Sequence, residues 1–345
     1  MIAIRPVLIA VLLGLTLVLA TQFPQVLATD LKPDAEASRQ APAAQLEAPW
    51  AEVRFRTDDG MLAYASLGEG PVLVVVPGGP GGSGFSMRHA FRPLAQHHTV
   101  VILDNIGRGR SSRLSDPERY TLARDVQDLE RLRLHLGLKT MAVYGHSYGG
   151  LVAQAYAAQH PQALSHLILG NTLHGARSWQ AQIDFFNDWL RRHDPERWQT
   201  LMELREQGKL SGSPEAQGLL GEAIKPLYWA NRARPTAKSA PSASPNDQLN
   251  LQVYLAMLGP DPEWRGGGTL RDVELLPRLK AVAAPTLLLT GRFDPVAPPS
   301  VMNEMQRAIN PAVLSRAQVF EHSAHRPFTE EPQAWLQTVS QFLAR

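Results

Sequence analysis

The five-residue stretch Gly145-His146-Ser147-Tyr148-Gly149 constrains the fold more than any other part of this chain. The apolar run at residues 141–144 before it is typical of a buried β-strand, and the small residues at 150–158 after it favour a helix. A strand, a G-x-S-x-G turn and a helix in this order predict a sharp turn that exposes the Ser147 hydroxyl above a sheet. Alone, the stretch would also fit an ordinary strand-to-helix loop. The rest of the chain decides between the two.

The other predicted elements alternate between strands and helices. A first hairpin is expected to turn at Asp58-Asp59-Gly60. Short apolar runs then predict strands at residues 72–76, 100–103, 141–144, 166–169, 286–290 and 318–320. Helices are predicted from the N-cap Thr121 to Gly137, near residues 301–309, and at 333–343. This alternation predicts an α/β fold with a mostly parallel sheet and helices on both faces.

A long insertion interrupts the alternation at residues 172–271. It carries helical stretches rich in Trp, Gln and Arg and no convincing strand. We expect it to form a helical cap over the strand ends, where α/β proteins bind their ligands. The core is then expected in two parts, residues 50–171 and residues 272–345.

The N-terminus is expected to lie outside the fold. A basic start precedes an uncharged apolar run at residues 6–20, and Val26-Leu27-Ala28 places small residues where a signal peptidase cleaves. Residues 1–28 are therefore predicted to be a signal peptide, and residues 29–49 a disordered spacer. Cleavage after Val18-Leu19-Ala20 is one alternative, and an uncleaved membrane anchor through residues 6–20 is another, although a span needs about 20 apolar residues. We expect export to a periplasm or to the exterior.

Composition narrows the possible functions. The 345 residues, 44% of them hydrophobic, suffice for one large domain with an insertion. Lys and Arg total 34 against 32 acidic residues without a basic run, so no nucleic-acid partner is expected. The absence of cysteine excludes disulfides, thiol catalysis and Cys-bound zinc. Membrane contact is expected only through the N-terminal segment, and the oligomeric state stays open.

A serine nucleophile needs an oriented base and an acid that holds the base. In α/β-hydrolases the acid and then the histidine follow the serine along the chain. Asp294 comes directly after an apolar strand, and His325 follows the next one, so Asp294 would hold the imidazole and His325 would take the Ser147 proton. The equivalent place one strand earlier holds Asn171, which has no carboxylate. His322 lies close enough in sequence to be an alternative base.

Two backbone N–H groups are needed to stabilise an oxyanion. One follows the nucleophile, at Tyr148, and the other is expected at Gly79 in the glycine-rich loop at residues 77–82. No Gly-Lys-Ser/Thr follows this loop, so it is not a phosphate-binding loop, and no His-Glu-x-x-His motif supports a metal. We therefore expect neither a cofactor nor a metal. His146 is expected to pack beneath the turn, because neighbouring side chains there point apart.

With these residues placed, the chain resembles the proline iminopeptidase family of α/β-hydrolases, the S33 peptidases. Residues 77–81 are similar to the family's His-Gly-Gly-Pro-Gly motif, and residues 104–111 to its Asp-Gln-Arg-Gly-x-Gly-x-Ser motif. The predicted helix at residues 125–133 also looks like the family's helix. Residues 325–332 look like the segment in which the family places its catalytic histidine before a Pro-Phe pair.

The resemblance implies an α/β-hydrolase fold in which Ser147, Asp294 and His325 are catalytic. It also implies an aminopeptidase that releases an N-terminal residue, often proline, from short peptides or amides. Residues 259–264 are similar to a family segment whose glutamate binds the free α-amine of the substrate, which would make Glu263 the amine anchor.

Three positions depart from the family pattern. Pro77 replaces a histidine, Ile106 replaces an arginine, and Pro295 stands where some members carry a second amine-binding glutamate. None of the three belongs to the expected triad, but they bear on specificity. A carboxylesterase or amidase that acts on small hydrophobic acyl compounds is therefore the alternative, and an inactive binding protein on the same fold is a further one.

Overall fold

The computed structural model describes residues 48–233 and 244–345. The predicted signal peptide, its cleavage after Ala28 and nearly all of the predicted spacer lie outside these ranges. The described residues all belong to one compact unit. Among them there is no helix with both the length and the apolar character that crossing a bilayer requires.

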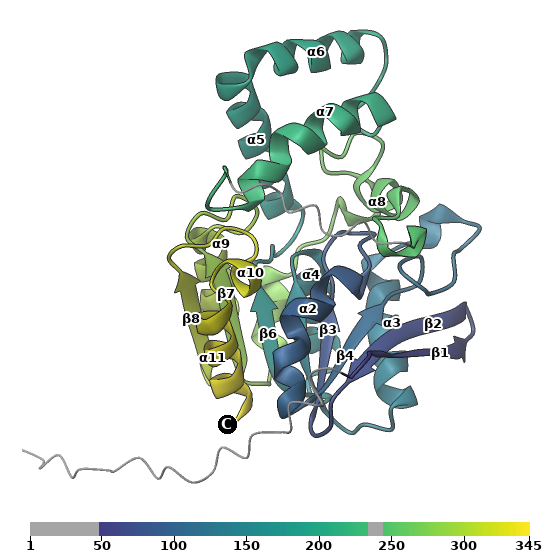
Figure 1. The fold of residues 1–345 in the computed structure, drawn as a ribbon, viewed down its shortest axis with the longest axis vertical. Helices are drawn as coiled ribbons and strands as arrows, with labels where there is room; N and C mark the ends of the chain where they lie inside the picture. Colours follow the sequence, from purple (N-terminus) through teal and green to yellow (C-terminus); the bar gives the residue numbers. More distant parts are fainter. Residues whose placement is uncertain (1–47, 234–243) are drawn as a thin grey trace, which may run out of the picture. The chain divides into compact units, whose positions relative to one another are not determined.

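An eight-stranded sheet in the order β1-β2-β4-β3-β5-β6-β7-β8 forms the centre of the fold (Figure 1). The strands are β1 (Ala51–Thr57), β2 (Gly60–Leu67), β3 (Val72–Val76), β4 (Thr99–Asp104), β5 (Met141–His146), β6 (Leu164–Gly170), β7 (Thr286–Gly291) and β8 (Ser315–Phe320). The hairpin β1–β2 is antiparallel and β2 pairs with β4 antiparallel, whereas every pairing from β4 to β8 is parallel. The predicted mostly parallel α/β sheet is confirmed, and the hairpin turns at Asp58 and Asp59 as expected.

Helices cover both faces of this sheet (Figure 1). They are α2 (Arg88–Phe91), α3 (Leu122–His135), α4 (Tyr148–Gln159), α9 (Pro299–Ala308), α10 (Pro327–Glu330) and α11 (Pro332–Leu343). Successive strand residues point to opposite faces, so Leu73 and Val75 pack with α2 and α11, while Val74 and Val76 pack with α3, α4 and α9. Because both faces are covered, the central strands β3, β5 and β7 are buried at almost every position, whereas the edge strands β1 and β8 carry exposed polar residues.

The ends of α3 show how local sequence sets an element. The Thr121 hydroxyl accepts a hydrogen bond from the Arg124 N–H at 3.1 Å, which satisfies one of the free donors of the first turn. Gly137 follows the helix with φ of +67°, the left-handed conformation in which helices commonly end. The predicted helix between these two residues is therefore confirmed.

The insertion between β6 and β7 is helical. Its helices are α5 (Ala176–His193), α6 (Pro195–Glu206), α7 (Pro214–Ile224) and α8 (Leu251–Leu258), and its described residues contain no strand of the sheet. In Figure 1, α5, α6 and α7 lie above the sheet. The boundaries of this cap at residues 172 and 271 stay predictions.

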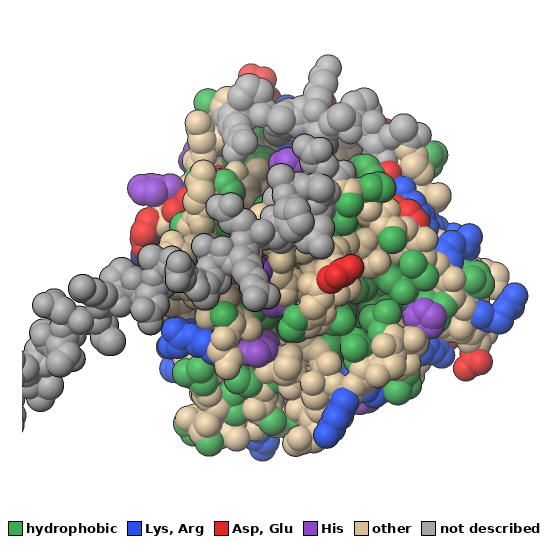
Figure 2. Space-filling model, turned by 60° about the horizontal axis from the view of Figure 1, so that its bottom comes forward, with side chains coloured by type: hydrophobic (Ala, Val, Ile, Leu, Met, Phe, Trp, Pro, Cys, Tyr) green, Lys and Arg blue, Asp and Glu red, His purple; other side chains and the backbone are tan. Residues whose placement is uncertain are grey.

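Charged side chains of both signs are interspersed with hydrophobic ones on the face that Figure 2 shows. Some charges join elements together. Arg124 and Arg131 of α3 pair with Asp59 in the turn of the first hairpin. Hydrogen bonds and charge attraction from these two guanidinium groups lower the pKa of Asp59 to about 2. The ion pairs tie the edge hairpin to α3.

Candidate active site

Ser147 occupies a strained turn between β5 and α4. Its φ of 54° and ψ of −123° lie in a region that side-chain-bearing residues rarely adopt. A Cβ at Gly145 would lie 2.4 Å from the Gly149 carbonyl oxygen, and one at Gly149 would lie 2.1 Å from that of Val76. Only glycine fits at both places. The sequence-predicted sharp turn is therefore what the structure shows, with Ser147 only partly buried.

Gly170 at the end of β6 and Thr172 shortly after it hold the Ser147 backbone from the neighbouring strand. The Ser147 N–H donates to the Gly170 carbonyl at 3.0 Å, and the Thr172 hydroxyl donates to the Ser147 carbonyl at 2.6 Å. These two bonds keep the turn in its unfavourable conformation, as the surroundings of a strained residue must.

Asp294 and His325 form a buried pair. The imidazole Nδ1 lies 3.0 and 3.1 Å from the two carboxylate oxygens, and the residues are 2% and 4% exposed. With Nδ1 as the donor, Nε2 is left to accept a proton. Burial alone would raise the pKa of Asp294, but the nearby His325, together with hydrogen bonds from Asn171 and Val296, holds it below its ordinary value. The carboxylate therefore stays charged beside the imidazole.

The other two histidines near the turn take different positions. His322 is exposed and its backbone N–H bonds Glu331 at 3.0 Å, whereas the ring of His325 is the one that contacts Asp294. His146 is buried, with its ring centroid 5.0 Å from that of His325. Burial lowers the pKa of His146 well below its ordinary value, and the neighbouring His325 lowers it further. His146 packs under the turn as a neutral ring.

The loop after β3 lies directly against the turn. A Cβ on Gly78 would approach the Ser147 Cβ to 3.0 Å, and Gly79 has φ of +139°, which favours glycine. Tyr148 is the first residue of α4, so its N–H belongs to the group that a helix cannot satisfy internally. The structure thus brings the loop that carries Gly79 against Ser147, while Tyr148 follows Ser147 along the chain. The roles of Gly79 and Tyr148 in binding an oxyanion stay predictions.

Glu263 lies in the cap, away from these loops. It is partly buried and lines a pocket with Arg205, Lys209 and Trp264 among others. The Tyr254 hydroxyl donates a short hydrogen bond to its Oε1. Burial raises the pKa of Glu263, and the hydrogen bond from Tyr254 partly offsets this effect.

Tyr228 is the link between the cap and the buried pair. Its carbonyl accepts a hydrogen bond from the His325 N–H at 3.2 Å, and its ring stands edge-on to that imidazole at 5.1 Å. Burial raises the pKa of the Tyr228 hydroxyl, and the negative charges of Glu263 and Asp294 raise it further. The charges of Glu263 and Asp294 therefore both act on the hydroxyl of Tyr228.

A second cap residue, Asn250, contacts the glycine-rich loop. Its N–H donates to the Gly81 carbonyl at 2.9 Å, and its side-chain amide donates to the Gly107 carbonyl at 2.7 Å. Neither Tyr228 nor Asn250 was singled out by the sequence, because neither belongs to a motif. Both reach the site through contacts that are distant along the chain.

A buried ion pair supports the residue after Ser147. Arg108 binds both oxygens of Asp125, at 2.6 and 2.7 Å, and both residues are almost fully buried. Tyr148 bonds the same carboxylate through its hydroxyl. In the sequence, Arg108 and Asp125 belong only to segments that resemble family motifs. In the structure, they meet at the side chain of Tyr148, the first residue of α4.

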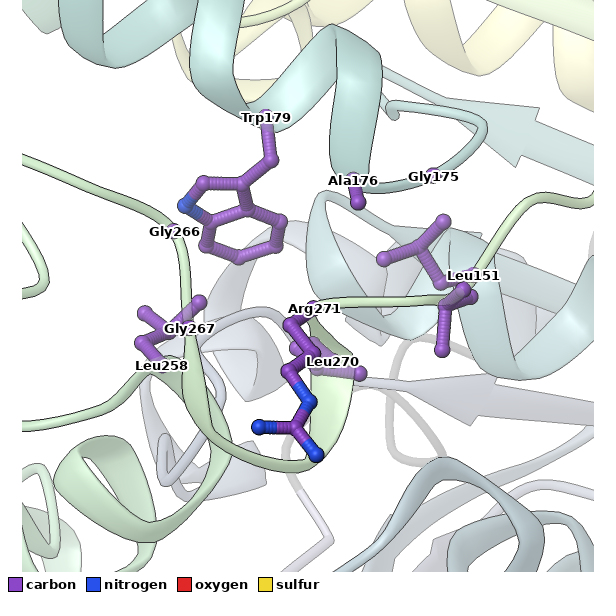
Figure 3. A pocket seen from close by; sticks show the side chains of 10 residues that line it. Leu151, Gly175, Ala176, Trp179, Leu258, Gly266, Gly267, Leu270 and Arg271 are labelled. Atoms are coloured by element: carbon purple, nitrogen blue, oxygen red, sulfur yellow. The ribbon is translucent and has the colours of Figure 1, made fainter.

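A mostly apolar cavity lies where the cap meets α4 (Figure 3). Leu151 of α4 faces Trp179 of α5 and Leu258 of α8 across it, with Arg271 among the other lining residues. Ser147 precedes Leu151 by one helical turn but is not one of the ten residues that line this cavity. Elsewhere in the described residues, no group of three or more acidic, His or Cys side chains is placed to hold a metal.

Known proteins resemble this chain in sequence and in fold. The family profile described as alpha/beta hydrolase fold matches residues 71–332. A proline iminopeptidase of Heyndrickxia coagulans is 29% identical over 80% of this chain and 91% of its own length. One from Lactobacillus helveticus is 30% identical over 80% of this chain and 90% of its own length. The crystal structure of proline iminopeptidase from Mycobacterium smegmatis superposes with a TM-score of 0.70, at 24% identity, over 85% of this chain and 98% of that chain.

Proposed function

The chain belongs to the α/β-hydrolase fold family and is a hydrolase related to the proline iminopeptidases, and on that basis we propose that it is a serine aminopeptidase. Ser147 is the nucleophile, His325 the general base and Asp294 the acid that orients it. The observation that carries this assignment is the strained φ of Ser147 at the same sheet edge as the buried pair of His325 and Asp294.

The reaction follows from the positions of these groups. The Ser147 oxygen attacks the substrate carbonyl carbon while His325 takes the hydroxyl proton, and Asp294 stabilises the imidazolium that forms. The N–H groups of Gly79 and Tyr148 bind the oxyanion. His325 then gives its proton to the leaving amine. Water, activated by the same imidazole, releases the acyl group from Ser147.

The substrate is a short peptide or amide with a free N-terminal residue, often proline. Two observations support this choice. First, relatives matched over most of their length are proline iminopeptidases. Second, the cap holds a partly buried carboxylate, Glu263, whose charge helps to raise the pKa of Tyr228, and the ring of Tyr228 contacts His325. A buried carboxylate in this place can pair with the substrate ammonium group.

The alternative substrate class is a small hydrophobic ester or amide. Pro295 favours it, because this residue supplies no second carboxylate for an amine. Export of the protein, with residues 1–28 as a signal peptide, is part of the proposal and is supported by the sequence alone. The cap at residues 172–271 is likewise proposed as a substrate-covering unit.

Substrate profiling tests the proposal directly. Proline and other aminoacyl anilides are compared with nitrophenyl esters of short acyl chains, with Ser147→Ala and His325→Ala as reference variants. We expect the anilides to be preferred and each variant to lose on the order of 10⁴-fold in kcat. A fluorophosphonate probe should label the wild type and not Ser147→Ala. Ester preference would select the alternative, and labelling of Ser147→Ala would refute the nucleophile.

A further inference from the structure

The residue after β6 is strained in the same way as Ser147 after β5. Asn171 has φ of +51°, and among the described residues it shares a positive φ only with Ser147 and glycines. β5 and β6 are paired neighbours, and His146 lies opposite Gly170 in their register. The two strained residues therefore stand side by side at one edge of the sheet, each directly after its strand.

The Asn171 side chain joins the acid to the loop of the base. Its Nδ2 donates to Oδ2 of Asp294 at 2.8 Å and to the carbonyl of Ala324 at 3.1 Å. An amide nitrogen has two hydrogens, so each bond uses one of them. Ala324 is the residue before His325, so a single amide fixes the carboxylate and the start of the segment that carries the imidazole.

The remaining bonds of Asp294 show why this contact matters. Oδ1 accepts from the Val296 N–H at 2.9 Å, within the acid's own loop. Asn171 is the donor that reaches the carboxylate from a different strand, and it helps to hold the pKa of Asp294 below its ordinary value. Without Asn171, Oδ2 of Asp294 would contact only the His325 ring, and fewer bonds would fix the orientation of the carboxylate.

A role in turning the backbone does not by itself explain how the Asn171 side chain is placed. Asparagine tolerates a left-handed φ better than most residues, so Asn171 could serve only to turn the chain. However, it is 1% exposed and its Oδ1 has no hydrogen-bond partner. A buried amide is normally satisfied at both ends. Here the unsatisfied oxygen is the consequence of aiming the nitrogen at Asp294.

We propose that Asn171 is a positioning residue that fixes the Asp294 carboxylate against His325. The inference rests on the proposed function, in which these two residues are acid and base. Asn171 itself touches no substrate, and it acts by limiting the orientations that the acid and the base segment can adopt.

Two truncations separate the positioning role from a backbone role. Asn171→Ala and Asn171→Gly both remove the amide, but only glycine adopts the left-handed φ without strain. We expect both to lower kcat by about 10- to 100-fold with KM changed less than about threefold, as for loss of a hydrogen bond to a charged group. A backbone role predicts a near-normal kcat for Asn171→Gly and a lower one for Asn171→Ala. That result would overturn the proposal.

Asn171→Asp adds a readout that structural damage does not move. Two buried carboxylates in contact share one proton, so the aspartate can donate to Asp294 only while it holds that proton, and the acid limb of the kcat/KM profile should therefore move. The matched control is Gln154→Leu, which removes a fully buried amide that bonds only the carbonyls of Gly150 and Leu173. It should lose stability and keep both kcat and the acid limb.

Thermal unfolding of each variant shows that it is folded before kinetics are compared, and Asn171→Gly carries the test if Asn171→Ala does not fold. Asp294→Asn separates the two proposals. If Asp294→Asn keeps wild-type activity, the proposed triad fails. If it is inactive while Asn171→Gly is as active as the wild type and Asn171→Asp leaves the acid limb in place, only the role of Asn171 fails.

Discussion

The Tyr148 hydroxyl donates a hydrogen bond to Oδ2 of Asp125 over 2.5 Å. The residue that follows Ser147 is thereby anchored to α3, on a carboxylate that Arg108 also binds. Bonds of this kind, with a charged acceptor in a buried site, are among the stronger ones in proteins. The side chain of Tyr148 thus fixes the place from which its own N–H is proposed to bind the oxyanion.

Tyr148→Phe should therefore affect catalysis as well as stability. The variant removes one bond to a buried carboxylate, so the free energy of unfolding should fall by about 1.5–3 kcal/mol. We expect kcat to fall as well, with KM nearly unchanged, because the oxyanion donor is less firmly held. Tyr156→Phe is the control, since Tyr156 bonds Glu130 at 2.7 Å two turns further along α4. It should lose stability alone, and equal kcat values for the two variants would contradict the prediction.

Asp128 should make stability depend on pH. Its side chain is fully buried, and burial, reinforced by the charge of Asp125, raises its pKa from 3.8 to about 7. The folded state then binds this proton more tightly than the unfolded state does. The contribution of protonated Asp128 to the free energy of unfolding is therefore present below about pH 4 and is lost as the pH rises to about 7.

Asp128→Asn should remove this slope and stabilise the protein at pH 7 by up to about 4 kcal/mol. The asparagine can still accept the Ile106 N–H bond that Asp128 accepts at 2.9 Å. Urea unfolding at pH steps between 4 and 8 measures the effect. Asp58→Asn is the control, because the Asp58 side chain is fully exposed. It should leave the dependence of stability on pH unchanged. If the slope persists in Asp128→Asn, another group causes it.

Glu263→Gln should change specificity and leave the chemistry intact. A charge-assisted bond to a substrate ammonium contributes about 1.5–3 kcal/mol, which corresponds to roughly 10- to 150-fold in kcat/KM. We expect a loss of that size on proline anilide and almost none on an acetyl ester. Because burial raises the pKa of Glu263, the preference for the anilide should also weaken as the pH falls.

Glu222→Gln on α7 is the control for this comparison, because the Glu222 side chain is 76% exposed. It should leave both substrates unaffected. Equal losses on the anilide and the ester in Glu263→Gln, or no loss on either, would favour the esterase alternative instead.

The N-terminal prediction concerns residues outside the structure. In a secreting host, the mature protein should begin at Thr29, as N-terminal sequencing of the exported fraction will show. Recovery of an intact Met1 in the membrane pellet would support the anchor through residues 6–20. A start at Thr21 would place the cleavage after Val18-Leu19-Ala20.

The sheet was predictable because its central parallel strands, such as β3, β5 and β7, are buried on both faces and therefore read as apolar runs. The segment at residues 84–96 was not predicted, although it forms α2 and short 3₁₀ turns. Its turns are too short to show a helical period. What fixes it is a long-range bond, from the Gly84 N–H to Oδ1 of Asp104 at 2.9 Å, and no local pattern records such a bond.

The same distinction applies to the site. Asp294 and His325 could be proposed from chain order, because each follows an apolar strand. The choice against His322 needed coordinates, since residues three apart on a loop have no fixed orientation. In the sequence, Asn171 is only a position without a carboxylate, and no local pattern records the bonds that its amide makes. The signal that points to it is a side-chain donor directly after the strand next to the nucleophile.

The contacts of Asn250 and Tyr228 have a consequence for protein engineering. A chimera that exchanges the helical insertion for one from a relative would replace the residues that bond the Gly81 carbonyl and the His325 N–H. Both are backbone bonds, so a graft keeps them only if its own backbone passes the host's loops at the same two places. A graft that does not should lose turnover before its substrate choice changes, and one that keeps the backbone path at positions 228 and 250 is the design with which to begin.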